Sequence, residues 1–198
     1  MKHNTHAKAA IFFISCLAGS SALAGQAMKT AGHTTQPIGH YELCQKSPAE
    51  CAQKSASAKP VQLTAKLWSA MQAVNNEANF TIEPVTDMDL WGVAEKWSYP
   101  AKRGDCEDYV LQKRIELMRE GVPASDLLIT VVRQQNGDGH AVLTVRTDRG
   151  DYIMDNLEPK ILLWNRTYYR YLKRQSEYSP GQWVSISDGR APVVGSVN

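Results

Sequence analysis

Apolar residues recur at intervals of three and four along two stretches of the chain, the spacing of one buried face of an α-helix. The first stretch predicts a helix over residues 65–79, with Thr64 as its N-cap. The second predicts a helix over residues 106–120 that stops at Gly121. The residues expected to face the core are Leu67, Met71, Val74 and Ala78 in the first helix, and Val110, Leu111, Ile115 and Met118 in the second.

The pattern changes to β-branched and alternating residues after residue 125. Leu127–Val132 and His140–Val145 predict two strands that are joined through Asn136-Gly137, a dipeptide typical of hairpins. Helices followed by an antiparallel meander predict an α+β fold. Between the two long helices we expect an extended segment over 79–85 and a short helix that Asp87 caps, and the later strands are expected at 152–155, 168–173 and 183–186.

Residues 1–24 have the pattern of a secretory signal peptide. Lys2 and Lys8 accompany an apolar stretch, and Ala22-Leu23-Ala24 matches a cleavage site. We therefore expect an exported protein. The apolar stretch is too short to cross a bilayer, and no later segment is long and apolar enough, so no membrane span is expected.

After the signal peptide we expect one folded domain with a preceding segment. Residues 25–60 are predicted to form an N-terminal lead with a disulfide loop, in which Gly25–Pro37 is mobile. Residues 61–188 are predicted to form the folded domain, and residues 189–198 a flexible tail.

The charge balance excludes a surface built for polyanions. Removing residues 1–24 takes two of the 22 lysine and arginine residues and none of the 20 acidic ones, so the two signs become equal. A chain of this balance has no electrostatic footprint for nucleic acid or an anionic membrane. The aromatic and basic segment Tyr168–Arg174 resembles some nucleic-acid surfaces, but its alternation favours a half-buried strand.

The cysteines predict one disulfide and one free thiol. Cys16 leaves with the signal peptide, so Cys44, Cys51 and Cys106 remain. Cys44 and Cys51 flank a Ser47-Pro48 turn, and we expect them to pair with each other. Cys106 is then the free thiol.

Cys106 lies in the string Gly104-Asp105-Cys106-Glu107-Asp108-Tyr109, at the first turn of the second predicted helix. The partial positive charge of a helix N-terminus favours a thiolate over a thiol. The thiolate is the nucleophile of cysteine hydrolases and acyltransferases. The alternative interpretation is a small buried residue at a helix start.

A cysteine nucleophile needs a base, and His140 is the candidate. Outside the signal peptide there are two other histidines, His33 and His40, and both lie in the predicted N-terminal lead. His140 instead opens a strand, where a sheet can hold its ring rigidly. The alternative is a half-exposed histidine at a strand start.

Asp155 is the candidate for orienting the imidazole of His140. If the turn between their strands centres on Asp148-Arg149, Asp155 lies opposite Val142 and on the same face as His140. A bulge at Gly150 would place it on the other face. Asp155 also fits a strand-end turn residue, and the sequence leaves this choice open.

The order Cys, His, Asp, with a helix leading antiparallel strands, resembles the bacterial transglutaminase-like cysteine peptidases, the family that contains the LapG-type periplasmic proteases. The resemblance covers nearly all of the chain after the signal peptide. The motifs that carry it are Cys44–Cys51, Gly104–Tyr109, Gly139–Leu143 and Asp155-Asn156.

The resemblance implies a transglutaminase-like, papain-like core in which the nucleophile helix packs on an antiparallel sheet. It implies a Cys106–His140–Asp155 triad that cleaves peptide bonds in the periplasm through a thioester. It also implies calcium held partly by Asp105 and Glu107, a protein substrate such as a surface adhesin, and an inner-membrane regulatory protein as partner. Two acids supply only some of the ligands that calcium needs, and helix-dipole stabilisation is the alternative role for each.

Three functions therefore compete. The leading hypothesis is a periplasmic cysteine peptidase that acts on an exported or cell-surface protein. The first alternative is an amidase or transglutaminase-type acyltransferase, in which an amine replaces water. The second alternative is a binding module that keeps the fold without the activity.

Overall fold

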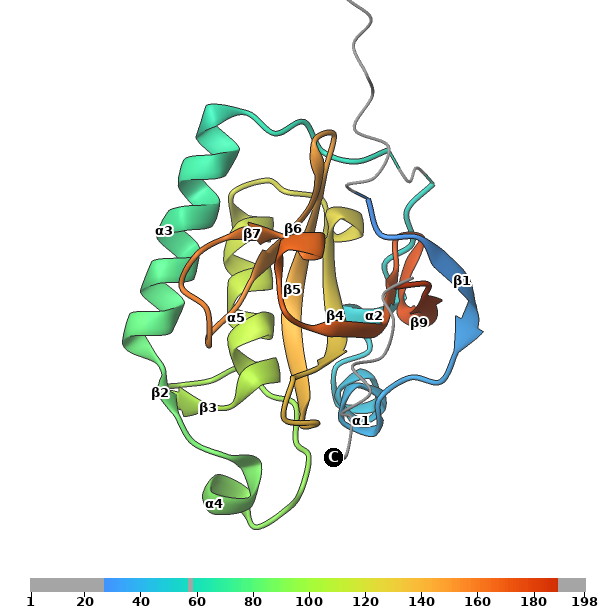
Figure 1. Cartoon of the computed structure of the whole chain (residues 1–198). Coiled ribbons are helices and arrows are strands. Elements are labelled where there is room, and N and C mark those ends of the chain that lie inside the picture. The colour runs from blue at the N-terminus through green and yellow to red at the C-terminus, as the bar shows by residue number, and fades with distance from the viewer. Residues whose placement is uncertain (1–26, 57–58, 189–198) are drawn as a thin grey trace, which may run out of the picture.

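A computed structural model describes residues 27–56 and 59–188, and Figure 1 shows their arrangement. The centre is a seven-stranded antiparallel sheet with the strand order β1-β9-β8-β4-β5-β6-β7. Its strands are β1 (Thr30–Thr34), β4 (Leu127–Arg133), β5 (Gly139–Thr147), β6 (Gly150–Met154), β7 (Leu162–Leu163), β8 (Arg170–Ser176) and β9 (Ser179–Ile186). Two short strands, β2 (Glu83–Pro84) and β3 (Arg103–Gly104), form a separate parallel pair.

Helices cover one face of this sheet, with α3 and α5 side by side (Figure 1). The helices are α1 (Ile38–Lys46), α2 (Ala49–Ala52), α3 (Ala65–Thr81), α4 (Asp87–Trp91) and α5 (Cys106–Arg119). Single 3₁₀ turns lie at Ala124–Asp126 and Trp164–Arg166. The α+β class and the packing of the cysteine helix on an antiparallel sheet are confirmed. The predicted signal peptide (1–24) and tail (189–198) lie outside the described residues, and the predicted domain boundaries stay a prediction.

The N-cap of α3 is the predicted one, because the Thr64 hydroxyl accepts a hydrogen bond from the backbone N–H of Leu67 at 3.1 Å. The helix continues to Thr81, two residues past the predicted end. The extended segment expected after it shrinks accordingly to β2. The cap of α4 is Thr86, whose side chain accepts from the Asp89 N–H, so the prediction that Asp87 caps this helix was wrong.

The buried face of α5 differs from the predicted one. Val110, Leu111 and Leu117 are buried, whereas the predicted Ile115 and Met118 are only half-buried. The helix turns its charged residues Lys113 and Arg114 inward as well, and an apolar stripe read from sequence cannot anticipate that. Arg114 is satisfied there: its Nε donates to the Leu127 carbonyl at 3.1 Å and its Nη1 pairs with Glu50 at 3.4 Å.

The sheet separates two apolar cores. The core under the helices includes Met71, Leu111, Leu117, Ile129 and Leu143, all of them at most 1% exposed. On the other face a smaller core is built around Val132, Val142, Ile153, Trp164 and Tyr171. Each face therefore takes alternate residues of β4 and β5, as the pleat requires.

The N-terminal segment is more ordered than predicted. β1 lies within Gly25–Pro37, which was expected to be a mobile lead, and it pairs with β9 at the sheet edge. His40, expected in a loose segment, is 1% exposed. Its Nδ1 accepts from the indole N–H of Trp183 at 3.2 Å, and its ring packs edge-on against Trp97 and Trp183. Burial, and then Arg114, lowers the pKa of His40 to about 4, so at neutral pH it is an uncharged packing residue.

The predicted disulfide between Cys44 and Cys51 is present, with a Cα–Cα distance of 5.6 Å, and Cys106 is a free cysteine. The bridge links α1 to α2, and α2 in turn packs on β9. No helix among the described residues has the length and apolar character of a membrane span.

Replacing both Cys44 and Cys51 by serine is expected to lower the free energy of unfolding by about 2–3 kcal/mol, because the crosslink restricts the unfolded chain. Urea unfolding followed by tryptophan fluorescence measures this change. Cys106→Ser, which leaves the bridge intact, is the matched control. Equal unfolding free energies for the double variant and the wild type would contradict the prediction.

Candidate active site

The N-terminus of α5 carries the predicted nucleophile. Asp105 is its N-cap, and Cys106 and Glu107 are its first two residues. Gly104 precedes them because a Cβ there would collide with the Asp108 side chain. That side chain points back under the turn, where its Oδ1 accepts from the backbone N–H of Ser98 at 2.8 Å. The local sequence thus places one cysteine at the N-terminus of a helix, where several carboxyl groups surround it.

The sulfur of Cys106 lies against the edge of β5. The backbone N–H of Ala141, the residue after His140, lies near this sulfur and acts to lower the pKa of the thiol. This N–H is available because the pairing of β5 with β6 ends at Leu143↔Met154. Burial, and then the nearby Glu107, raises the pKa of the Cys106 thiol, so the thiol keeps its proton in this arrangement.

His140 and Asp155 form a buried pair beside this edge, with 2.8 Å between Nε2 and Oδ1. The turn between their strands closes as Thr147↔Gly150, and this register continued past Leu143↔Met154 places Asp155 opposite Val142. Asp155 therefore lies on the same face of the sheet as His140, as the first of the two predicted alternatives requires. Because Asp155 holds Nε2, the other ring nitrogen, Nδ1, is left to face a reacting group.

Asp155 accepts two further hydrogen bonds. The Tyr169 hydroxyl donates to Oδ2 at 2.5 Å, and the backbone N–H of Leu157 donates to Oδ1 at 3.0 Å. Burial alone would raise the pKa of Asp155, but the hydrogen bonds from His140, Tyr169 and Leu157 outweigh it and lower that pKa. The Tyr169 ring also packs against the His140 ring, with 5.5 Å between centroids.

Cys106 and His140 are neighbours without a direct bond. Across residues 27–56 and 59–188 no hydrogen bond joins them; the Cys106 thiol donates instead to Glu107 Oε2 at 3.1 Å. Catalytic hydrogen bonds are often long or unformed before substrate binds. The structure thus brings the three predicted residues to one place and shows which carboxyl group competes for the thiol proton.

Asp105 and Glu107 belong to a cluster of three acids, the third being Asp87. One carboxylate oxygen of each lies within 4.8 Å of the others. The parallel pairing of β2 with β3 brings Asp87 to this cluster, and a hydrogen bond from the Val85 N–H to the Gly104 carbonyl extends that pairing. The backbone N–H of Asp87 itself donates to Asp105 Oδ2 at 3.1 Å. The cluster adjoins the thiol through Glu107.

The charges in this cluster are poorly compensated. Burial, and then Asp105, raises the pKa of Glu107 to about 9, so its carboxyl group keeps a proton at neutral pH. Burial also raises the pKa of Asp87. Asp87 Oδ1 and Asp105 Oδ1 are buried and have no hydrogen-bond partner. Hard carboxylate oxygens left unpaired in this way suit a hard divalent cation such as calcium.

Comparison with known proteins agrees with this geometry. The sequence profile described as "bacterial transglutaminase-like cysteine proteinase BTLCP" matches residues 30–191. The chain belongs to the bacterial transglutaminase-like cysteine proteinases. No individually curated protein matches its sequence.

Solved structures of LapG from Legionella pneumophila resemble this proteinase. One is 26% identical over 60% of this chain and 68% of its own, with a TM-score of 0.50. An EGTA-treated form is 24% identical, covering 62% and 73% of the two chains, and a calcium-bound form is 21% identical, covering 82% and 87%; both have TM-scores of 0.50. At such identities the last two comparisons support the fold alone.

Two residues of this proteinase's site, Asp87 and Tyr169, were missed from the sequence. Asp87 was interpreted as a helix cap, and only the two-residue parallel pairing of β2 with β3 brings it to Asp105. Tyr169 was placed in a half-buried strand, but β8 begins at Arg170 and leaves it in the preceding segment. No local pattern signals either contact, because each depends on a distant partner.

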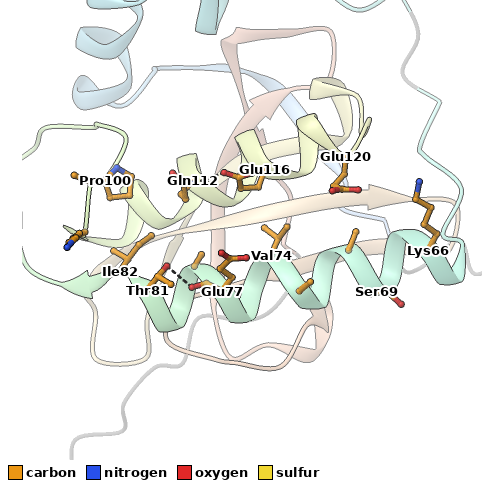
Figure 2. A pocket seen from close by; sticks show the side chains of 15 residues that line it. Lys66, Ser69, Val74, Glu77, Thr81, Ile82, Pro100, Gln112, Glu116 and Glu120 are labelled. Carbon is orange, nitrogen blue, oxygen red and sulfur yellow. Dashed lines mark hydrogen bonds between the residues drawn. The ribbon is translucent and has the colours of Figure 1, made fainter.

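A large hollow lies apart from the triad. Figure 2 shows a groove of about 990 Å³ between α3 and α5, lined by residues such as Val74, Glu77, Ile82, Gln112 and Glu116. None of its lining residues is a cysteine or histidine, and neither Cys106 nor His140 borders it. A large pocket is the usual default for an active site, but this one contains neither of the residues predicted to be the nucleophile and the base.

Tyr169→Phe is expected to raise the pKa of Asp155, because it removes one donor to the ionised carboxylate. A carbon-13 NMR titration of the aspartate carboxyl groups measures the shift. Tyr168→Phe is the matched control, since Tyr168 is 82% exposed and makes no side-chain hydrogen bond in the described chain. An unchanged or lower pKa in Tyr169→Phe would count against the assigned network.

Proposed function

We propose that Cys106, His140 and Asp155 are the catalytic triad with which this proteinase hydrolyses peptide bonds. The observation that carries the proposal is the buried 2.8 Å His140–Asp155 pair next to Cys106, the free cysteine of the described residues. Asp155 occupies Nε2, so the free Nδ1 is the atom that serves the thiol. Other catalytic triads also use one ring nitrogen for the carboxylate and the other for the nucleophile, although in the serine-protease triad Nδ1 faces the carboxylate and Nε2 the nucleophile.

Each residue of the triad has its own role in the proposed reaction. His140 Nδ1 takes the proton of Cys106 Sγ, and the thiolate attacks the carbonyl carbon of the scissile bond. The resulting tetrahedral intermediate collapses to a thioester, and the departing amine takes the proton from His140. Water, giving its proton to His140, attacks the thioester, and the acid product and the free thiol are released. The backbone N–H of Cys106, at the helix start, is a donor for the oxyanion.

Asp155 keeps the imidazole in one orientation and stabilises it when it is protonated. The lowered pKa of Asp155 favours its ionised form, which is the form that stabilises imidazolium. Tyr169 and the Leu157 N–H fix the carboxylate from its other sides, at 2.5 and 3.0 Å. The orienting group is therefore itself held in place.

We also propose that the enzyme works in the periplasm on an exported or cell-surface protein, such as an adhesin. The signal-peptide pattern of residues 1–24 supports the location. The family and its LapG neighbours support a protein as the substrate. A membrane-bound regulatory partner remains an expectation from the resemblance described above.

Calcium is the proposed cofactor, held by Asp87, Asp105 and Glu107. The support is the mutual 4.8 Å spacing of their oxygens together with the unpartnered Asp87 Oδ1 and Asp105 Oδ1. The structure of Legionella pneumophila LapG with calcium bound is consistent with this choice. When bound, the cation would supply positive charge that favours the thiolate of Cys106. Asp108, whose pKa burial raises to about 7, lies behind the helix turn and bonds Ser98 instead.

Cys106→Ser and His140→Ala are each expected to abolish hydrolysis, because one removes the nucleophile and the other its base. Asp155→Asn should retain more activity than His140→Ala, since an amide still orients the ring while stabilising imidazolium poorly. Single-turnover cleavage of a verified protein substrate gives the order.

All three variants should stay folded, because these side chains lie at a helix start and at strand ends. Circular dichroism is the folding control, and iodoacetamide labelling of Cys106 reports the thiol independently of any substrate. A folded His140→Ala variant that cleaves at the wild-type rate would disprove the triad, whereas a folded wild type that cleaves nothing would favour a binding module.

Asp87→Asn is expected to weaken calcium binding by about tenfold or more, because it removes one of three charged ligands from the site. Isothermal calorimetry on the full chain measures the affinity without any turnover. Asp89→Asn, an exposed acid on the same helix, is the matched control and should leave binding unchanged. Absence of calcium binding at millimolar concentration in the wild type would reject the site.

A further inference from the structure

A second hollow lies next to the triad, at the turn between β4 and β5. It measures about 310 Å³, and we call it the hairpin pocket; its lining residues are Gln134, Gln135, Asn136, Tyr168 and Tyr169. None of these side chains carries a charge at neutral pH. The charged side chains of the same turn make hydrogen bonds within it: Arg133 donates to the Gly137 carbonyl at 2.6 Å, and Asp138 accepts from the lining residue Asn136 at 2.7 Å.

Tyr169 lines the hairpin pocket and also contacts two residues of the proposed triad. Its ring packs on His140 at 5.5 Å between centroids, and its hydroxyl bonds Asp155. One aromatic ring therefore separates the pocket from the base.

The proposed mechanism indicates whether the residues before or after the cleaved bond extend toward the pocket. His140 hands its proton to the departing amine, so the imidazole stands on the leaving-group side of the scissile bond. Cys106 packs against the core under the helices, whereas Tyr169 packs against the core on the other face of the sheet and against the His140 ring. Tyr169 and the pocket therefore lie on the side of the base that is turned away from Cys106. Residues that follow the cleaved bond are thus the ones that extend toward the pocket.

The lining chemistry defines what fits. Tyr168 is 82% exposed, a large aromatic surface with no partner that buries it. Tyrosines in this position commonly anchor a binding partner, since they bury much area at low entropic cost. The side-chain amides of Gln134 and Gln135 make no hydrogen bond within the described chain, so they are available to peptide N–H and C=O groups. An uncharged lining would leave a buried charge of the substrate unpaired.

We propose that the hairpin pocket binds a large uncharged side chain, aliphatic or aromatic, located on the leaving-group side of the scissile bond. Tyr168 is the specificity-determining residue of this subsite, and Gln134 and Gln135 bind the adjoining peptide groups. The proposal rests on the peptidase function proposed above and adds to it a substrate class.

The test is digestion of a proteome-derived peptide library in calcium-containing buffer, with cleavage positions mapped by mass spectrometry. Wild type, Tyr168→Ala, Tyr178→Ala and Cys106→Ser are compared. Tyr178 is the matched control because it is also an exposed tyrosine, 53% exposed, but lies at the opposite end of β8, in the turn before β9. Both substitutions remove surface side chains and leave the cores intact.

We expect Phe, Tyr, Trp, Leu and Met together to be enriched about tenfold over charged residues at one of the first three positions after the cleaved bond. Tyr168→Ala should remove most of this enrichment, and Tyr178→Ala should keep it. Cleavage that depends on Cys106 but shows no such preference, or a preference that survives Tyr168→Ala, would overturn the subsite and leave the peptidase standing. Loss of all Cys106-dependent cleavage in the wild type would instead overturn the peptidase, and the subsite with it.

Discussion

The site depends on where β6 stops pairing with β5. Past Leu143↔Met154 the edge of β5 is open, so its backbone donors need other partners. The Ala141 N–H lies near the sulfur of Cys106, and the chain after Met154 is free to turn Asp155 toward His140. A strand pair two residues longer would use that N–H in the ladder and would exclude the helix start. The positions of Cys106, His140 and Asp155, the proposed triad, thus share one structural cause.

Burial acts in opposite directions on the two halves of this site. Asp155 is as buried as Glu107, yet three hydrogen-bond donors lower its pKa, whereas Glu107 faces two other carboxyl groups and its pKa rises to about 9. The partial charge of a helix N-terminus, about half a unit, is too small to offset this crowding. The reactivity of Cys106 is therefore set less by its helix than by how its acidic neighbours are neutralised.

The sequence predicted the parts of the site that local patterns encode. The helix start at Cys106, the strand that His140 opens and the Cys44–Cys51 bridge all follow from spacing within a few residues. It did not predict Asp87 beside Asp105, because a two-residue parallel pairing has no periodicity to detect. Likewise the inward-facing Arg114 and the buried His40 depend on distant partners, Leu127 and Trp183, that satisfy their polar atoms only in the folded chain.

The pairing of β1 with β9 also constrains the order in which this chain assembles. Thr30 pairs with Ile186, so the first described strand must wait for the last one to be synthesised before the sheet edge closes. The Cys44–Cys51 loop, with a sequence separation of 7, closes at far lower entropic cost and does so early. Contacts of such long sequence separation slow folding, and until β9 arrives β1 is an unpaired edge open to other chains. A chaperone that shields unpaired strands would therefore have to protect β1, the first described strand, for longer than the strands that follow it.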